Sequence, residues 1–118
     1  MYRILTFSVL LVTLTAMAAC GSSPASPSTP AADVTIQILG NLASQSYSPN
    51  PTVMRVGQSV AWHNGDTTAH DATQDAAGFA TGSLNANATS TPVMMSTAGT
   101  FTYHCTIHPG MVGTITVQ

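Results

Sequence analysis

Residues 103–111 of the chain read YHCTIHPGM, and three of their side chains are good metal ligands. The thiol of Cys105, the imidazole of His108 and the thioether of Met111 all fall in this one short stretch. Residues 100–105 lead into this stretch and overlap its start. They and the last residues of the chain alternate as strands do, with every second side chain facing the same way. The sequence therefore predicts two strands joined by a loop that carries three candidate ligands.

The donors in this loop favour copper. Thiolate and thioether sulfurs are soft and neutral imidazole is borderline, so the set selects copper over magnesium, calcium or manganese. His70 is the candidate for a fourth donor, because it follows an earlier strand and the turn signal Asn64-Gly65-Asp66, where a β-sandwich can bring it opposite Cys105. Two histidines, one cysteine and a weak axial methionine form the ligand set of a blue-copper electron-transfer site.

The remainder of the body reads as short strands separated by turn residues. After the first 32 residues there is no helical periodicity of useful length, and the region between Asp71 and Asn87 has few apolar anchors. Several short strands in so short a chain predict an all-β, two-sheet β-sandwich that occupies residues 33–118. The predicted strands cover residues 34–38, 52–56, 59–63, 89–95, 100–105 and 112–118.

The start of the chain has the features of an export signal. Residues 1–19 combine Arg3, an apolar stretch and small residues before Cys20. The apolar part is shorter than the ~20 residues of a membrane-spanning helix. Cys20 stands where a bacterial lipoprotein carries its lipid, which predicts an anchored protein; simple cleavage and secretion is the alternative. A disulfide between Cys20 and Cys105 is the other interpretation that two cysteines permit.

Residues 20–32 predict a lipidated cysteine followed by a tether. The stretch is rich in serine and proline, contains no bulky apolar side chain and cannot form a core. At about 3.1 Å per residue in the extended proline-rich conformation, residues 21–32 reach roughly 35 Å. We therefore expect an extracytoplasmic domain in the cell envelope that touches a membrane only through its lipid.

Charge is scarce in this sequence. Only 5% of the residues are charged, and Arg3 and Arg55 are the only lysine or arginine side chains. Such a chain cannot build the basic surface of a nucleic-acid-binding protein. Removal of the signal leaves Arg55 against four aspartates, so we expect docking through apolar contacts with little electrostatic steering.

Residues 34–118 resemble the plastocyanin/azurin (cupredoxin) family. The resemblance rests on the segments YSPNP at 47–51, VGQSVAW at 56–62, AGTFTYHC at 98–105 and MVGTI at 111–115, together with the turn before His70. The ligand loop has the spacing C-x2-H-x2-M, which is similar to that of amicyanin and shorter than the usual plastocyanin loop.

This resemblance implies a Greek-key sandwich with one type 1 copper ion near one end. His70 and His108 would bind copper through ring nitrogens, Cys105 through a short thiolate bond and Met111 through a long axial contact. Electrons would pass through the exposed edge of His108, which we expect to be ringed by apolar residues including Pro109, Met111 and Val112.

Two residues depart from the family pattern. Asp71 follows the first histidine where relatives commonly have a neutral residue, and an inward-facing carboxylate there would stabilise Cu(II) and lower the reduction potential. Alternatively, Asp71 bonds to loop amides or faces water. His104 stands where plastocyanins carry a tyrosine; strand alternation turns it away from the Cys105 face, so we expect a surface residue and not a fifth ligand.

These features predict a monomeric one-electron carrier between redox protein partners that the sequence does not identify, and not an enzyme. Multicopper enzymes need paired His-x-His motifs, which are absent, and a dinuclear copper centre needs two cysteines near each other, whereas only Cys105 lies in the body. A copper-binding protein for delivery or buffering would use the same four ligands, so that function stays open. A sandwich with incidental Cys, His and Met residues fits their spacing poorly.

Overall fold

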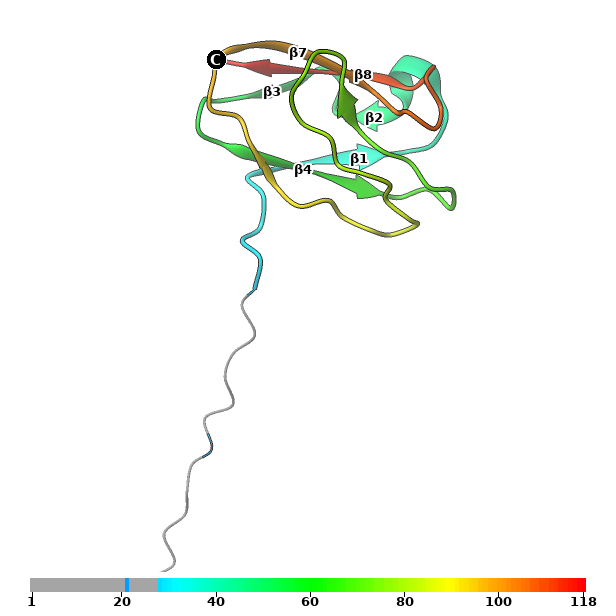
Figure 1. The fold of residues 1–118 in the computed structure, drawn as a ribbon, viewed down its shortest axis with the longest axis horizontal. Coiled ribbons are helices and arrows are strands. Elements are labelled where there is room, and N and C mark those ends of the chain that lie inside the picture. The colour runs from blue at the N-terminus through cyan, green and yellow to red at the C-terminus, as the bar shows by residue number, and fades with distance from the viewer. Residues whose placement is uncertain (1–20, 22–27) are drawn as a thin grey trace, which may run out of the picture.

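The fold consists of two four-stranded sheets packed face to face, seen in a computed structural model that describes residues 21 and 28–118 (Figure 1). One sheet has the order β2-β1-β4-β6 and the other β3-β8-β7-β5. The prediction of an all-β, Greek-key two-sheet sandwich is confirmed. The elements are β1 (Val34–Ile38), the 3-10 helix η1 (Ala43–Gln45), β2 (Tyr47–Ser48), β3 (Thr52–Met54), β4 (Ser59–Asn64), β5 (Thr73–Gln74), β6 (Val93–Met94), β7 (Gly99–His104) and β8 (Val112–Val117).

The predicted signal, residues 1–19, and the lipidation site Cys20 lie outside the described residues, as does part of the tether. Within the part of the chain that is described, no helix has the length and apolar character needed to cross a membrane.

Strand β1 illustrates how alternation places residues. Ile36 and Ile38 are fully buried, whereas Thr35 and Gln37 between them are exposed. The strand runs parallel to β4 with Ile36 opposite Trp62 and Ile38 opposite Asn64. Because the register is fixed by this buried face, the end of β4 is held beside the end of β1. The turn that leads to His70 therefore starts from a rigid point.

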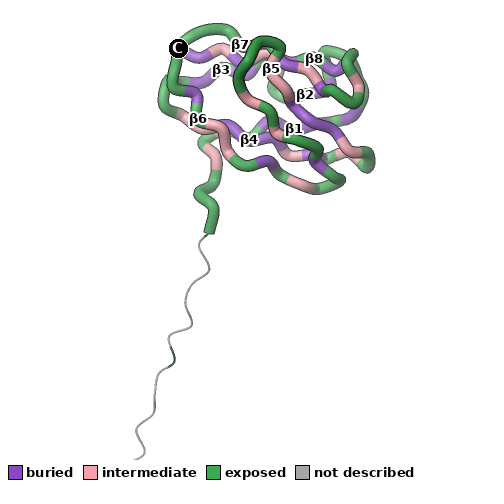
Figure 2. Tube along the Cα trace, viewed as in Figure 1, coloured by how far each residue is buried: buried purple, intermediate pink, exposed green. Residues whose placement is uncertain are grey.

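Aromatic rings fill the space between the sheets. The ring centroids of Tyr47 and Tyr103 are 4.8 Å apart, and those of Trp62 and Phe79 are 5.0 Å apart. Trp62 also meets Tyr103 edge to face at 5.6 Å. Figure 2 shows that the buried segments follow the strands, while exposed segments form the loops. These contacts join both sheets into one core beneath the ligand loop.

The strands differ from the sequence prediction mainly in their ends. The second predicted strand stops at Met54, and the stretch 89–95 contributes only Val93–Met94 as a regular strand. Pro92 lacks a backbone donor, which fits the short pairing there. The region 71–87, which has few apolar anchors, adds β5 and two isolated bridges that pair His70 with Leu84 and Thr73 with Ala80.

Candidate metal centre

His70 is held in the interior by a short backbone ladder. Its backbone N–H donates to the carbonyl of Leu84 at 3.1 Å, and the Leu84 N–H donates back to the His70 carbonyl at 2.7 Å. The imidazole is fully buried. The segment between β4 and β5 therefore presents this side chain from a fixed backbone position.

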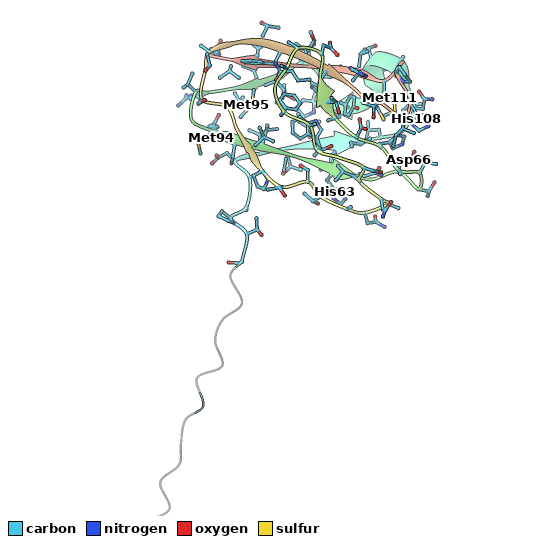
Figure 3. All side chains as sticks on the ribbon, viewed as in Figure 1. His63, Asp66, Met94, Met95, His108 and Met111 are labelled. Carbon is cyan, nitrogen blue, oxygen red and sulfur yellow. The ribbon has the colours of Figure 1, made fainter. Side chains whose placement is uncertain are left out.

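The other three candidate ligands come from the loop between β7 and β8. The N–H of Cys105 donates to the Met111 carbonyl at 3.1 Å, and the N–H of Met111 donates to the His108 carbonyl at 2.9 Å. These two bonds fold the loop back on itself. Cys105 and Met111 are fully buried, whereas His108 keeps part of its ring at the surface. Met111 and His108 lie together at one end of the sandwich (Figure 3).

Three donor atoms converge where the two segments meet. The Nδ1 atoms of His70 and His108 are 3.1 Å apart, and the Sγ atom of Cys105 is 3.9 Å from Nδ1 of His108. One ligand atom from each of the three residues falls within 4.8 Å of the others. The structure thus brings together His70, Cys105 and His108, with Met111 in the same loop.

The sulfur of Cys105 is buried and accepts a backbone hydrogen bond. The cysteine is free and fully buried, and the backbone N–H of Asp71 donates to its Sγ atom at 3.3 Å. A soft thiolate beside two imidazoles and a methionine is a donor set that fits copper.

Asp71 uses its carboxylate to hold the ligand loop. Its Oδ1 atom accepts from the Thr106 N–H at 2.7 Å, and its Oδ2 atom accepts from the Thr106 hydroxyl. The side chain is almost fully buried. Of the alternatives that the sequence left open, hydrogen bonding to a loop amide is therefore the one observed. The carboxylate nevertheless faces inward, and it contacts Thr106, the residue after Cys105.

Asp66 contacts a candidate ligand and was not singled out from the sequence. Its Oδ2 atom lies 2.7 Å from Nε2 of His70. The hydrogen bond from His70, with those from Thr68 and Thr67, lowers the pKa of this carboxyl below its ordinary value. The sequence offered one signal, an aspartate in the turn four residues before His70. That signal points to a contact only when the imidazole is known to face the turn.

The other two histidines have separate partners. His104 pairs through Nδ1 with Oδ1 of Asp75 at 2.6 Å, and both side chains are partly exposed. His63 pairs through Nδ1 with the Thr89 hydroxyl at 2.8 Å. Within the described residues, the cluster able to hold a metal comprises His70, Cys105 and His108, without His104. His104 lies at the surface, as strand alternation predicted.

Comparison with known proteins agrees with this geometry. The model of the family "Copper binding proteins, plastocyanin/azurin family" matches residues 34–118. The chain belongs to the plastocyanin/azurin family. This cupredoxin is 31% identical to plastocyanin from Scenedesmus fuscus over 98 residues, which cover 73% of the chain and 100% of the plastocyanin.

Solved structures share the fold of this cupredoxin. A purple cupredoxin from Nitrosopumilus maritimus has a TM-score of 0.66 and 29% identity, with 73% of this chain and 100% of that chain covered. An amicyanin variant in the Cu(I) form has a TM-score of 0.61 and 24% identity, covering 72% and 81% of the respective chains. A copper-containing nitrite reductase from Thermus scotoductus has a TM-score of 0.63 and 31% identity, but only 22% of that chain is covered.

Membership of the plastocyanin/azurin family identifies copper as the cofactor of this cupredoxin. The family binds one copper ion, and the cluster of His70, Cys105 and His108, with Met111 nearby, fits a type 1 site. The copper expected from the soft donors of the sequence is therefore confirmed.

Proposed function

We propose that this cupredoxin is a blue-copper electron carrier of the bacterial cell envelope, with His70, Cys105, His108 and Met111 as the copper ligands. The observation that carries the proposal is the convergence of donor atoms from His70, Cys105 and His108 within 4.8 Å. Copper supplies a one-electron couple between Cu(II) and Cu(I). The chain would shuttle that electron between redox protein partners that are still to be identified.

The protein favours electron transfer by restricting ligand movement. The backbone of His70 is tied to Leu84, and the loop of Cys105 is closed by two backbone hydrogen bonds. Burial of Cys105 and Met111 keeps water from both sulfurs. Because the ligands are held in one arrangement, little rearrangement would accompany each change of oxidation state.

The surface around His108 supports an apolar docking patch. We define this patch by the exposed apolar side chains near His108 in the chain, Ile107 in the ligand loop and Val112 at the start of β8. Pro109, also exposed, lies between Ile107 and Val112 in the chain. Met111, which we expected in this ring, is fully buried and cannot contact a partner. A partner seated on the patch would meet the partly exposed ring of His108.

The envelope location is supported by the N-terminal sequence. Residues 1–19 have the pattern of an export signal, Cys20 has the position of a lipidated cysteine, and residues 21–32 would serve as the tether. In this arrangement the domain is monomeric and contacts the membrane through its lipid alone. Mass spectrometry of the protein isolated from membranes tests the lipid directly, since an unmodified N-terminus would contradict it.

An absorption spectrum with added Cu(II) tests the function. We expect an intense visible thiolate-to-copper band that disappears with a reductant and returns on oxidation. Cys105→Ser should abolish the band, and Met111→Leu should keep it while shifting the potential, because only the cysteine provides the strong bond. Tight Cu(I) binding without a reversible couple would contradict the carrier and favour delivery or buffering.

A further inference from the structure

The hydrogen bond between Asp66 and His70 fixes the tautomer of this buried imidazole. An ionised carboxylate only accepts hydrogen bonds, so Nε2 of His70, 2.7 Å from Oδ2 of Asp66, must carry a proton. In a neutral imidazole the other nitrogen then has a free lone pair. That nitrogen is Nδ1, the atom that lies 3.1 Å from Nδ1 of His108. The carboxylate thereby selects the metal-binding form of the ring.

Asp66 is itself held by its own turn. Its Oδ1 atom accepts from the Thr67 N–H and its Oδ2 atom from the Thr68 hydroxyl, both at 2.7 Å. The Asp66 N–H donates to Oδ1 of the buried Asn64 at 3.0 Å. With both oxygens engaged, the carboxylate cannot rotate freely away from His70. Asp66 and His108 lie at the same end of the sandwich (Figure 3).

The same network connects this turn to the backbone of His70. The side-chain amide of Asn64 donates to the carbonyl of Thr68 at 2.7 Å and to that of Leu84 at 2.8 Å. Leu84 in turn forms the two backbone bonds with His70. Carboxylate and imidazole are therefore positioned by one hydrogen-bonded unit.

Gly40 lies close to the carboxylate of Asp66. A Cβ atom built at this glycine would lie 3.4 Å from Oδ2 of Asp66. The φ angle of Gly40 is +128°, a conformation that other residues rarely adopt. Among the described residues, the ion-pair partner of Asp66 is His70, and no arginine pairs with this carboxylate. The charge of Asp66 therefore acts mainly on the imidazole.

We propose that Asp66 is the positioning residue of the copper site: it holds His70 with Nδ1 directed at the metal, and its charge lowers the reduction potential. This inference rests on the proposed function. A carboxylate that accepts from a ligand histidine orients the ring and raises its basicity, and loss of such a partner typically costs about 10–100-fold in metal affinity. Greater ligand basicity favours Cu(II) over Cu(I), since the more highly charged ion gains more from it.

Two substitutions separate orientation from charge. Asp66→Asn removes the charge and keeps one oxygen, which accepts from Nε2 only in the amide orientation that gives up the bond to the Thr67 N–H. In that orientation we expect a higher potential with most of the Cu(II) affinity retained. Asp66→Ala removes both, and Cu(II) affinity, measured by chelator competition, should fall about 10–100-fold. A tenfold loss confined to the oxidised site corresponds to a rise of about 59 mV for a one-electron couple.

Asp75→Asn provides the matched control. It neutralises an aspartate that pairs with His104, a histidine outside the cluster, at 2.6 Å. This variant should leave both affinity and potential at their original values. Equal shifts in Asp75→Asn and Asp66→Asn would overturn the proposal, because they would show a general effect of charge. Unchanged affinity and potential in Asp66→Ala would also overturn it.

Nitrogen-15 NMR of the metal-free protein gives a readout that needs no copper. His70 should be the Nε2–H tautomer in the original chain and a mixture of tautomers in Asp66→Ala. A dominant Nδ1–H tautomer in the original chain would overturn the positioning role. Absence of a copper band in the original protein would instead refute the proposed function, while the NMR result would still decide how Asp66 holds His70.

Discussion

The backbone N–H of Asp71 donates to the sulfur of Cys105 at 3.3 Å, although 34 positions separate these residues in the chain. The carboxylate of the same aspartate accepts from the backbone N–H of Thr106. One residue thus holds both the proposed thiolate ligand and the start of its loop. Because Asp71 directly follows His70, the two segments that carry the proposed ligands are locked to each other.

Asp71→Asn should raise the reduction potential of the copper site. The amide oxygen can still accept from the Thr106 N–H, so the loop stays in place while a buried negative charge is lost. Removal of that charge favours Cu(I), which protein-film voltammetry would detect. An unchanged potential would show that the carboxylate acts only as a clamp on the loop.

Two buried tyrosines should respond in opposite ways to loss of the hydroxyl. The Tyr47 hydroxyl donates to the Asp71 carbonyl at 2.6 Å. Tyr47→Phe leaves that buried carbonyl without this donor and should lower the free energy of unfolding by about 1–3 kcal/mol. The Tyr103 hydroxyl has no hydrogen-bond partner among the described residues. Tyr103→Phe should be neutral or stabilise by about 1 kcal/mol. Urea unfolding of the metal-free variants measures both values, and equal losses would contradict this distinction.

Alkaline pH should destabilise the fold through Tyr103. Burial raises the pKa of this phenol from 10.0 to about 12. A pKa that is higher in the folded state means that the stabilisation is complete below pH 10 and is lost as pH rises towards 12. The loss that corresponds to this rise in pKa is on the order of 3 kcal/mol.

Tyr103→Phe is the control for this pH dependence. The phenylalanine cannot ionise, so the decline in the free energy of unfolding above about pH 10 should be smaller in this variant. Tyr47, whose pKa burial also raises, would account for alkaline destabilisation that remains. A decline of equal size in Tyr103→Phe and the original chain would exclude Tyr103 as its cause.

Electron exchange through the apolar docking patch should depend only weakly on salt. The patch residue Val112 is 44% exposed, and Val112→Lys should slow electron self-exchange because two like charges would meet when the patches approach. That variant should also regain rate as salt screens the charge. Met94→Lys is the control, since Met94 is 66% exposed but lies at the other end of the sandwich from His108 (Figure 3). Equal slowing by both variants would show that electrons do not pass through the apolar docking patch beside His108.

The sequence was most informative where the chemistry is local. Cys105, His108 and Met111 share one loop, and strand alternation on either side predicted its flanks, so the loop with three candidate ligands followed from spacing alone. The sandwich itself was equally predictable, because buried positions recur at every second residue in strands such as β1. His70 required a further assumption, that the fold places its turn opposite Cys105.

Features that depend on long-range packing could not be predicted in the same way. Asp66 bonds to His70 because the imidazole turns Nε2 towards Asp66, and no spacing rule encodes that orientation. The direction of the Asp71 carboxylate depends on Thr106, which is distant in sequence. The exposure of Met111 was predicted wrongly, because the loop turns its side chain inward while Ile107 faces solvent.

The chain enters the sandwich at the end opposite the donor cluster. Strand β1 starts with Val34 opposite Val60 and finishes with Ile38 opposite Asn64, next to the turn that carries Asp66 (Figure 1). An anchor at Cys20, as proposed, would therefore connect to the end of the domain remote from His108. The attachment point would then leave the partly exposed ring of His108 uncovered for redox partners.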